Sequence, residues 1–516
     1  MNRRRRSGLI LALGFSLAVP TKAQNDVDLT GGAFNDVTTI EVEGTPGRKY
    51  LLMISVFTGT GMSFIPNTSY DVGDEFLNFI IGFPGFVGAL DNNGQAQTQL
   101  VLPYFPILEA FPLYLQLLTT GTSGNKLVDA SQVQIWTGQT KNTYKSPFLG
   151  TDFVTERSVH SMTPLADGET ILIAGGHYGG ITGAYGQDTA EIYDRRTEDL
   201  TVLANTLVQA RTGHTGTLLN DGRVLLAGGA DEVLGEPTDT AEVYDPVTQT
   251  FSSVGDLSGG PRALHRAVKL QDGRVLLVGG TNNYNDPSYI ILGGQKSTTL
   301  FDPATDTFSP GPDMSIERLA ATATLLPSGN VLVAGGYTIL FGVLPVISDT
   351  AEVYQFQPGQ AGLFGSSQLM FADRFGHSAT LLDSGETLVV GGANGTDPLK
   401  PQAELTWELF NETFGFINQG PIHDGRILPS MNTLLDGKVL ITGGAKGELL
   451  FPVSVKTSEI WDPITQVSTV QADLLQDRAG HMGITLPDGT VLLTGGGHGD
   501  ATGIQTGLTT LEIYQP

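Results

Sequence analysis

The stretch RTGHTGTLLNDGRVLLAGG, residues 211–229, carries the signals that decide the fold of this 516-residue chain. Asp221-Gly222 is a pair that supplies the positive φ of a tight hairpin turn. The run Val224–Ala227 after it is apolar at every position, which is typical of a strand buried on both faces. Gly228-Gly229 ends this run, and Arg211 lies 17 residues before Gly228. The stretch therefore predicts two antiparallel strands joined by a two-residue turn.

The same pattern recurs seven times, with successive glycine pairs 51 to 56 residues apart. The first glycines of the pairs are Gly175, Gly228, Gly279, Gly335, Gly391, Gly443 and Gly495. Each is preceded, 17 or 18 residues earlier, by one arginine of the set Arg157, Arg211, Arg262, Arg318, Arg374, Arg426 and Arg478. A regular period of this length predicts a repeat architecture.

A third strand in each unit carries an acid, as in Ala241-Glu242-Val243-Tyr244-Asp245, and Thr250-Phe251 opens a fourth. Six units have a matching glutamate, and the third has Thr299 instead; the glutamates are Glu191, Glu242, Glu352, Glu404, Glu459 and Glu512. Because a catalytic residue is needed once and these recur, we expect the arginines and glutamates to pair and to lock strands or blades together. Four strands in each of seven units predict an all-β, seven-bladed propeller.

The seventh unit stops at Ile513–Pro516, after its third strand, and Thr143-Tyr144 resembles the fourth-strand opening Thr250-Phe251. We therefore expect residues 141–147 to complete the last blade, which makes 141–516 the propeller. Residues 24–140 lack the repeat and show short β-like runs separated by Gly, Pro and Asn turns. This pattern predicts a small β-sandwich before the propeller.

The seven concerted copies resemble the bacterial kelch-repeat proteins, whose superfamily includes the galactose-oxidase-type propellers. The resemblance covers residues 141–516 and implies the propeller fold, with ligands bound by the loops after the second strand and before the first. It says little about activity, because this scaffold hosts many functions.

Histidines fall into two groups. Five follow the arginine by three positions, at His160, His214, His265, His377 and His481, and we expect them to be structural; Ala321 and Pro429 take this place in the other two blades. His177, His423 and His498 lie outside this register. His177 and His498 each follow a glycine run in blades that become neighbours on ring closure. With Tyr178 and Asp500 they are candidates for binding a metal or a polar ligand, or are plain loop residues.

Two longer loops on the same face carry aromatic residues, which are Tyr284, Tyr289, Tyr337 and Phe341. Exposed aromatics among Asn and Asp would suit a sugar or a protein partner, or could pack within the protein.

The N-terminus predicts export. Arg3–Arg6 precede the apolar stretch Leu9–Val19, and Ala23 ends a small-residue cleavage signal, so residues 1–23 form a signal peptide. The stretch is too short to span a bilayer, so we expect no membrane span in the mature chain. We expect the mature protein to be secreted, or to lie at the cell surface or in the periplasm of a bacterium. The net charge of −25 disfavours nucleic acid as a partner.

Three functions follow. The first is an exported binding scaffold that uses the propeller loop face for a glycan or protein and has no cofactor. The second is a carbohydrate-active enzyme on a galactose-oxidase-like propeller. The chain has no cysteine, so the Tyr–Cys copper radical of those oxidases is excluded. The third is a structural cell-surface or matrix protein.

Overall fold

A computed structural model describes the strands of residues 26–136 by their backbone, and then residues 142–146, 152–153, 155–178, 185–231, 236–282, 294–340, 344–395, 402–448, 451–500 and 503–516. The chain forms two compact units, residues 1–141 and 142–516. Every regular element among the described residues is a strand, so none of them belongs to a helix long and apolar enough to cross a membrane.

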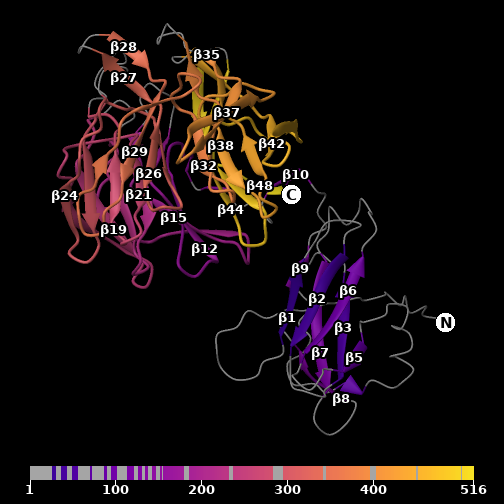
Figure 1. The fold of residues 1–516 in the computed structure, drawn as a ribbon. Coiled ribbons are helices and arrows are strands. Elements are labelled where there is room, and N and C mark those ends of the chain that lie inside the picture. Colours follow the sequence, from indigo (N-terminus) through magenta and orange to yellow (C-terminus); the bar gives the residue numbers. More distant parts are fainter. Residues whose placement is uncertain are drawn as a thin grey trace. The chain divides into compact units, whose positions relative to one another are not determined.

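The first unit contains two antiparallel sheets, as a β-sandwich requires (Figure 1). One has the order β1 (Asp26–Thr30), β2 (Val37–Glu43), β6 (Gln95–Val101). The other has the order β4 (Tyr70–Asp71), β8 (Lys126–Ala130), β7 (Leu113–Thr120), β3 (Lys49–Ser55), β5 (Val87–Ala89), and β9 (Gln134–Trp136) also pairs with β7.

The second unit is a seven-bladed β-propeller of antiparallel sheets. Blades one to three are β11 (Ser161–Pro164), β12 (Thr170–Ala174), β15 (Ala190–Asp194), β16 (Asp199–Val202); β17 (Thr215–Leu218), β18 (Val224–Ala227), β19 (Thr240–Asp245), β20 (Thr250–Asp256); and β21 (Arg266–Lys269), β22 (Val275–Val278), β23 (Thr298–Asp302), β24 (Thr307–Pro310).

Blades four to six are β25 (Thr322–Leu325), β26 (Val331–Ala334), β29 (Thr350–Gln355), with β30 (Leu363–Phe364) and β31 (Gln368–Leu369) both on β29; β32 (Ser378–Leu381), β33 (Thr387–Val390), β36 (Thr406–Asn411), β37 (Gly415–Pro421); and β38 (Ser430–Thr433), β39 (Val439–Thr442), β42 (Ser458–Asp462), β43 (Val467–Val470). The first strand of each blade contacts the first strands of both neighbouring blades, so these strands form a closed inner ring.

The seventh blade joins the two ends of the propeller. It consists of β44 (Met482–Thr485), β45 (Val491–Thr494), β48 (Leu511–Gln515) and β10 (Thr143–Lys145). Tyr144 lies opposite Tyr514 in antiparallel register, and the centroids of their rings are 5.1 Å apart. The fourth strand of this blade therefore comes from residues 143–145, within the segment that the sequence analysis expected to close the ring.

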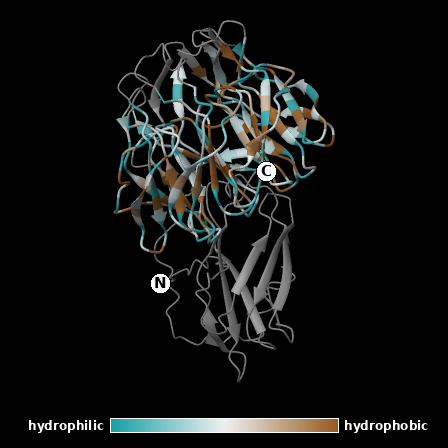
Figure 2. Ribbon diagram, turned by 60° about the vertical axis from the view of Figure 1, so that its left-hand side comes forward, coloured by the Kyte–Doolittle hydropathy of each residue, from teal (hydrophilic) through white to brown (hydrophobic). Residues whose placement is uncertain are grey.

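Apolar side chains fill the layers between blades, which explains why the second strands are apolar at successive positions. In β12, Leu172 packs with side chains of blade two, and Ile173 packs with side chains of blade seven. Alternate residues of a strand point to opposite faces of its sheet, and each sheet here has a neighbour on both faces. In Figure 2 the hydrophobic segments accordingly recur along the strands of the propeller.

Among the described residues, five blades carry an additional hairpin between their second and third strands. These hairpins are β13 (His177–Tyr178) with β14 (Tyr185–Gly186), β27 (Tyr337–Leu340) with β28 (Leu344–Ile347), β34 (Ala393–Asn394) with β35 (Gln402–Ala403), β40 (Ala445–Glu448) with β41 (Phe451–Ser454), and β46 (Gly497–Asp500) with β47 (Gly503–Gly507).

Candidate functional site

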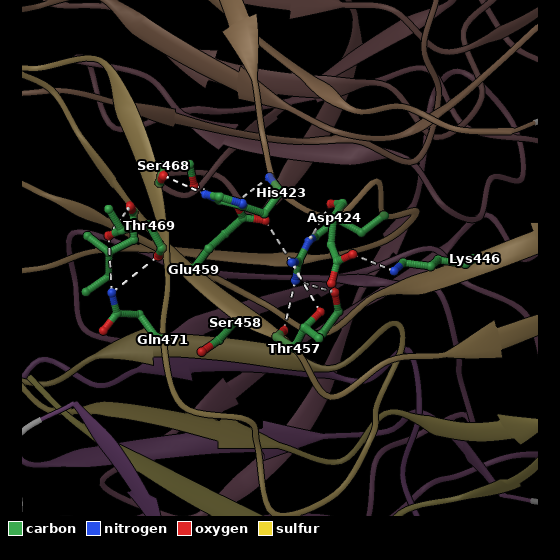
Figure 3. Close-up of polar contacts among 12 residues, drawn as sticks. His423, Asp424, Lys446, Thr457, Ser458, Glu459, Ser468, Thr469 and Gln471 are labelled. Carbon is green, nitrogen blue, oxygen red and sulfur yellow. Dashed lines mark hydrogen bonds and ion pairs between the residues drawn. The ribbon is translucent and has the colours of Figure 1, made fainter.

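The repeated arginine is the centre of a buried polar network, as blade six shows. Nη1 of Arg426 donates to the carbonyl oxygens of Gly443 and Thr457 at 3.0 and 2.9 Å, and Nη2 donates to Oε1 of Glu459 at 2.8 Å. Oε2 of Glu459 accepts the N–H of His423 at 2.9 Å. Figure 3 shows His423, Thr457 and Glu459 brought together from separate strands and loops. The guanidinium thus joins the approach to the first strand to the ends of the second and third strands.

Six blades contain this ion pair, with both side chains buried. The pairs and their N···O distances are Arg157–Glu191 2.8 Å, Arg211–Glu242 2.7 Å, Arg318–Glu352 3.1 Å, Arg374–Glu408 2.5 Å, Arg426–Glu459 2.8 Å and Arg478–Glu512 2.6 Å. Each pair lies within one blade.

The expectation that Glu404 belongs to this set was wrong, because Glu408 is the partner of Arg374. Ala403-Glu404-Leu405 imitates the Ala-Glu-apolar pattern of the other third strands, but it lies just before β36. Glu404 instead accepts hydrogen bonds from Nδ2 of Asn394 and, at 2.6 Å, from Oγ1 of Thr406.

The backbone of the same arginine joins adjacent blades. In all seven blades its carbonyl accepts the N–H of the second glycine of the preceding blade, at 2.8 to 3.0 Å. The bond from Gly496 to Arg157 closes the ring between blades seven and one. The arginines therefore hold the scaffold together.

The five in-register histidines also lie between blades. Nε2 of each is paired with a hydroxyl of the preceding blade: His160–Thr494 2.8 Å, His214–Ser161 2.9 Å, His265–Thr215 3.0 Å, His377–Thr322 2.8 Å and His481–Thr442 2.9 Å. Burial lowers the pKa of His160 to about 3 and holds the pKa of the other four well below the usual value. These imidazole rings are therefore neutral at pH 7, and each one links its blade to the preceding blade through a hydrogen bond.

Arg266 is a polar residue of the inner ring that the sequence analysis missed. It occupies the position that Ser161 and Thr215 hold in blades one and two. The next blade has Ala321 where a histidine would stand, and Nε of Arg266 donates to the carbonyl of Ala321 at 2.9 Å. The sequence signal beside Arg266 is the loss of the histidine at Ala321, although Ser378 is unchanged where Pro429 replaces the histidine and donates to the Pro429 carbonyl instead.

The hairpins of blades five, six, seven and one form a continuous surface, which we call the hairpin rim. In it β35 contacts β40, β41 contacts both β46 and β47, and β47 contacts β13. At the end of the rim, the N–H of Gly186 donates to the carbonyl of Asp231 in blade two at 2.6 Å. The rim places residues that are far apart in sequence on one face of the propeller.

Two tyrosines stand out on the rim. Tyr178 and Tyr185 lie opposite each other on β13 and β14, and their ring centroids are 6.1 Å apart. They are 47% and 49% exposed. Beside them, Nδ1 of His177 is 3.1 Å from Oγ1 of Thr212, and burial lowers the pKa of His177 to about 4.

His498 belongs to a second polar group on the rim. Its side chain is 49% exposed, and Nδ1 lies 2.7 Å from Oδ2 of Asp477. The hydroxyl of the buried Ser454 donates to the same carboxylate oxygen, and it accepts the N–H of Gly499 at 2.9 Å. The carboxylate thus lies between serine and histidine. A nucleophilic serine needs the histidine in the middle, so this order suits ligand binding better than acyl transfer.

The remaining candidates differ in their contacts. His177 and His498 bind different partners, Thr212 and Asp477. Tyr337 was a candidate ligand contact, with packing inside the protein as the alternative; it is 2% exposed, and its ring packs against Phe375 with centroids 5.7 Å apart. The side chain of Tyr337, the first residue of β27, belongs to an apolar cluster of residues from blades four to six, so it is not accessible to a ligand. Tyr284, Tyr289, Phe341 and the side chain of Asp500 lie outside the described residues.

Among the described residues, no three His, Asp or Glu side chains come together as a group that could hold a metal ion.

The class of the propeller follows from these contacts and from comparison with known proteins. A kelch motif is recognised over residues 211–258, the stretch that contains Arg211, Gly228-Gly229 and Glu242. The propeller of residues 142–516 therefore contains a kelch motif in its second blade, and the other blades repeat the same buried arginine and glycine pair.

Two solved structures are similar to part of this chain. A fungal alcohol oxidase of the AA5 family, in complex with copper, aligns with a TM-score of 0.54 at 16% identity, over 71% of this chain and 75% of its own. The structure of YjhT aligns with a TM-score of 0.44 at 13% identity, over 70% of this chain and 95% of its own. At such identities the likeness concerns the fold alone. No curated protein sequence matches the chain at a significant level.

Proposed function

We propose that the protein is an exported binding scaffold that takes a glycan on its hairpin rim. The observation that carries this proposal is the exposed pair Tyr178 and Tyr185, 6.1 Å apart between centroids, on a rim that also holds His498 and Asp477. Tyrosine rings offer apolar faces to sugar rings, and the carboxylate of Asp477 and the imidazole of His498 can form hydrogen bonds with sugar hydroxyls.

The buried repeats support binding rather than catalysis. The arginines, glutamates and in-register histidines with the most perturbed environments are engaged in holding strands and blades together. Perturbed groups in a propeller of this kind would otherwise be the first candidates for an active site.

The test is affinity for a panel of neutral oligosaccharides, measured by calorimetry with the full chain and with a Tyr178→Ala/Tyr185→Ala variant. Phe414→Ala is the matched control, since Phe414 is 78% exposed in the turn between β36 and β37, at the opposite end of its sheet from the hairpins. We expect the double variant to lose at least about tenfold in affinity and the control to lose none. Equal affinity in all three proteins would refute the placement on the rim.

A protein ligand is the second form of this proposal, because exposed tyrosines are also frequent anchors of protein interfaces. The kelch-type propeller and the acidic net charge of −25 are compatible with a neutral or basic protein partner. If no oligosaccharide of the panel binds, the glycan is excluded and a protein remains the ligand to seek.

Export is the other part of the proposal. It rests on Arg3–Arg6, the apolar stretch 9–19 and the small-residue site at Ala23. We expect protein recovered outside the cytoplasm to begin near Gln24, which mass spectrometry of its N-terminal peptide would show. An intact Met1 on exported protein would contradict cleavage.

A further inference from the structure

The outer strands of blades four, five and six expose large apolar side chains, which we call the apolar edge. Its members are Leu369 on β31, Ile417 on β37, Ile464 in the turn before β43, and Val467 and Val470 on β43. Their exposed fractions range from 42% to 91%. Apolar side chains of this size that adjoin one another on a surface mark an interaction site, whereas scattered ones do not.

The apolar edge is continuous across the three blades. β37 contacts both β31 and β43. Between blades five and six, Nδ2 of Asn418 donates to Oε1 of Gln466, which brings the segments of Ile417 and Val467 side by side. Between blades four and five, a Cβ at Gly415 would lie 2.8 Å from Oε1 of Gln368, so the segment that carries Leu369 touches the start of β37.

The outer strands of blades two and three have a different surface. The exposed side chains of β20 include Ser252, Ser253 and Asp256, and those of β24 include Thr307 and Ser309. All these blades share one topology, so the propeller fold does not require apolar side chains on its outer strands. The apolar edge is therefore a particular property of blades four to six.

The apolar edge also lies on stretches of chain without charge. Residues 355–372, 413–422 and 463–472 contain no Asp, Glu, Lys, Arg or His. The fourth strands of blades one and two, in contrast, carry Asp199 and Asp256. Interface cores are depleted of charged residues in the same way.

The net charge of the chain indicates which partner fits such a surface. At −25, two copies of the chain repel each other wherever their acids meet, so they can approach only where acids are absent. A cationic partner would instead be recognised by acids, which the apolar edge lacks. Glu412, just before the second of these stretches, is held towards blade four, because its Oε1 accepts hydrogen bonds from Ser328 and Asn330 at 2.7 Å each.

We propose that the protein forms a homodimer in which the apolar edge of one copy packs against the apolar edge of a second copy. The contact is isologous, with the same residues on both sides of a twofold axis. Side chains make it, rather than a joining of the two sheets, because the bulge at Ile417 and Pro421 at the end of β37 interrupt that strand edge. The dimer does not depend on the hairpin rim or on its ligand.

The experiment is sedimentation velocity of the full chain over a range of micromolar concentrations. We expect the mass to rise from that of one chain to that of two as the concentration increases. Added sodium chloride should tighten the dimer, because salt screens the repulsion between two acidic copies and leaves an apolar contact intact.

A matched pair of variants places the contact. Ile464→Glu should raise the dimer Kd at least about tenfold, because it puts a carboxylate on each side of the twofold axis. Val247→Glu is the control and should leave the Kd unchanged. Val247 follows Asp245-Pro246 in the turn of blade two as Ile464 follows Asp462-Pro463, and the two side chains are 90% and 91% exposed.

A further variant removes apolar area without adding charge. Leu369→Ala/Val467→Ala should also raise the Kd at least about tenfold, and circular dichroism checks that each variant is folded. The proposal is overturned if the wild type stays monomeric at every concentration, which would leave the apolar edge to a different partner. It is also overturned if Ile464→Glu dimerises as tightly as the wild type, or if Val247→Glu weakens the dimer equally.

Discussion

Replacing a buried arginine should cost far more in blade two than in blade three. Arg211→Met leaves the carboxylate of Glu242 buried without its cation. Breaking a buried ion pair in this way costs about 3–5 kcal/mol. Arg262→Met leaves no charge behind, because its neighbours are the neutral groups of Ser297, Thr299 and Gly279. We expect this second loss to be at most about 2 kcal/mol, the scale of a few hydrogen bonds.

The assay is thermal unfolding followed by circular dichroism, with both variants in the same buffer. Unfolding entropy is about 2.1 cal/mol/K per residue, so over residues 142–516 a loss of 4 kcal/mol lowers the Tm by about 5 °C. The Arg262→Met variant should lose at most about 2.5 °C, by the same conversion. Equal shifts in the two variants would refute the argument that the stranded carboxylate, rather than the lost arginine packing, sets the cost.

Three further outcomes follow from the contacts of the propeller. Gly175→Ala should lower the free energy of unfolding by more than about 3 kcal/mol, because the added Cβ would lie 2.5 Å from the carbonyl oxygen of Arg211. Gly168→Ala is the control, since Gly168 has a similar positive φ and no atom within 4 Å of an added Cβ, and it should cost about 1 kcal/mol. Equal losses in urea unfolding would contradict this. Tyr144→Ala should lower the free energy of unfolding by about 3–5 kcal/mol, because it removes a buried aromatic side chain from the closing strand β10. The control Val247→Ala, at an exposed position, should cost less than about 0.5 kcal/mol. A small loss at Tyr144 would show that β10 does not stabilise the closed propeller. The pKa of His214 is depressed in the folded state, so the stabilising effect of its neutral side chain is complete above pH 6.5 and is lost as the pH falls. His214→Gln should therefore make the free energy of unfolding decline less steeply below pH 6, by about 1.4 kcal/mol per pH unit. An unchanged slope would contradict the depressed pKa.

The sequence predicted the propeller well because each blade repeats the same local signals. Asp-Gly turns, apolar second strands and glycine pairs depend on neighbours in the chain, so they can be read without a structure. Glu404 shows the limit of this reading, because the true partner Glu408 lies in Trp407-Glu408-Leu409, which lacks the Ala-Glu pair found in blades one, two and four. Only the register of β36 against β33 decides between the two.

The candidate site was less predictable, because it depends on contacts between hairpins. Tyr178 was selected from sequence, but its neighbour Tyr185 was not, since the turn between them carries no regular signal. The burial of Tyr337 could not be predicted from the sequence, because it depends on residues of neighbouring blades that pack around its side chain.

Backbone conformation was also hidden from the sequence. The residue two after each repeated arginine has a positive φ of 52° to 64° in all seven blades, yet four of these residues are not glycine: Val159, Leu264, Ala320 and Leu428. The conformation is imposed by the ring, in which the N–H of Leu264, for example, donates to the carbonyl of Gly213 in the preceding blade at 2.8 Å.

The closing strand has a mechanical consequence. Residues 143–145 are both the outer strand of blade seven and the first part of the propeller after the N-terminal unit. Tension applied to that unit is therefore transmitted first to the pairing of Thr143, Tyr144 and Lys145 with β48, before any other blade is loaded. The propeller would yield to such a pull at its seam, so anchoring the N-terminal unit to a surface while the rim is held by a ligand would place the load on this one short strand.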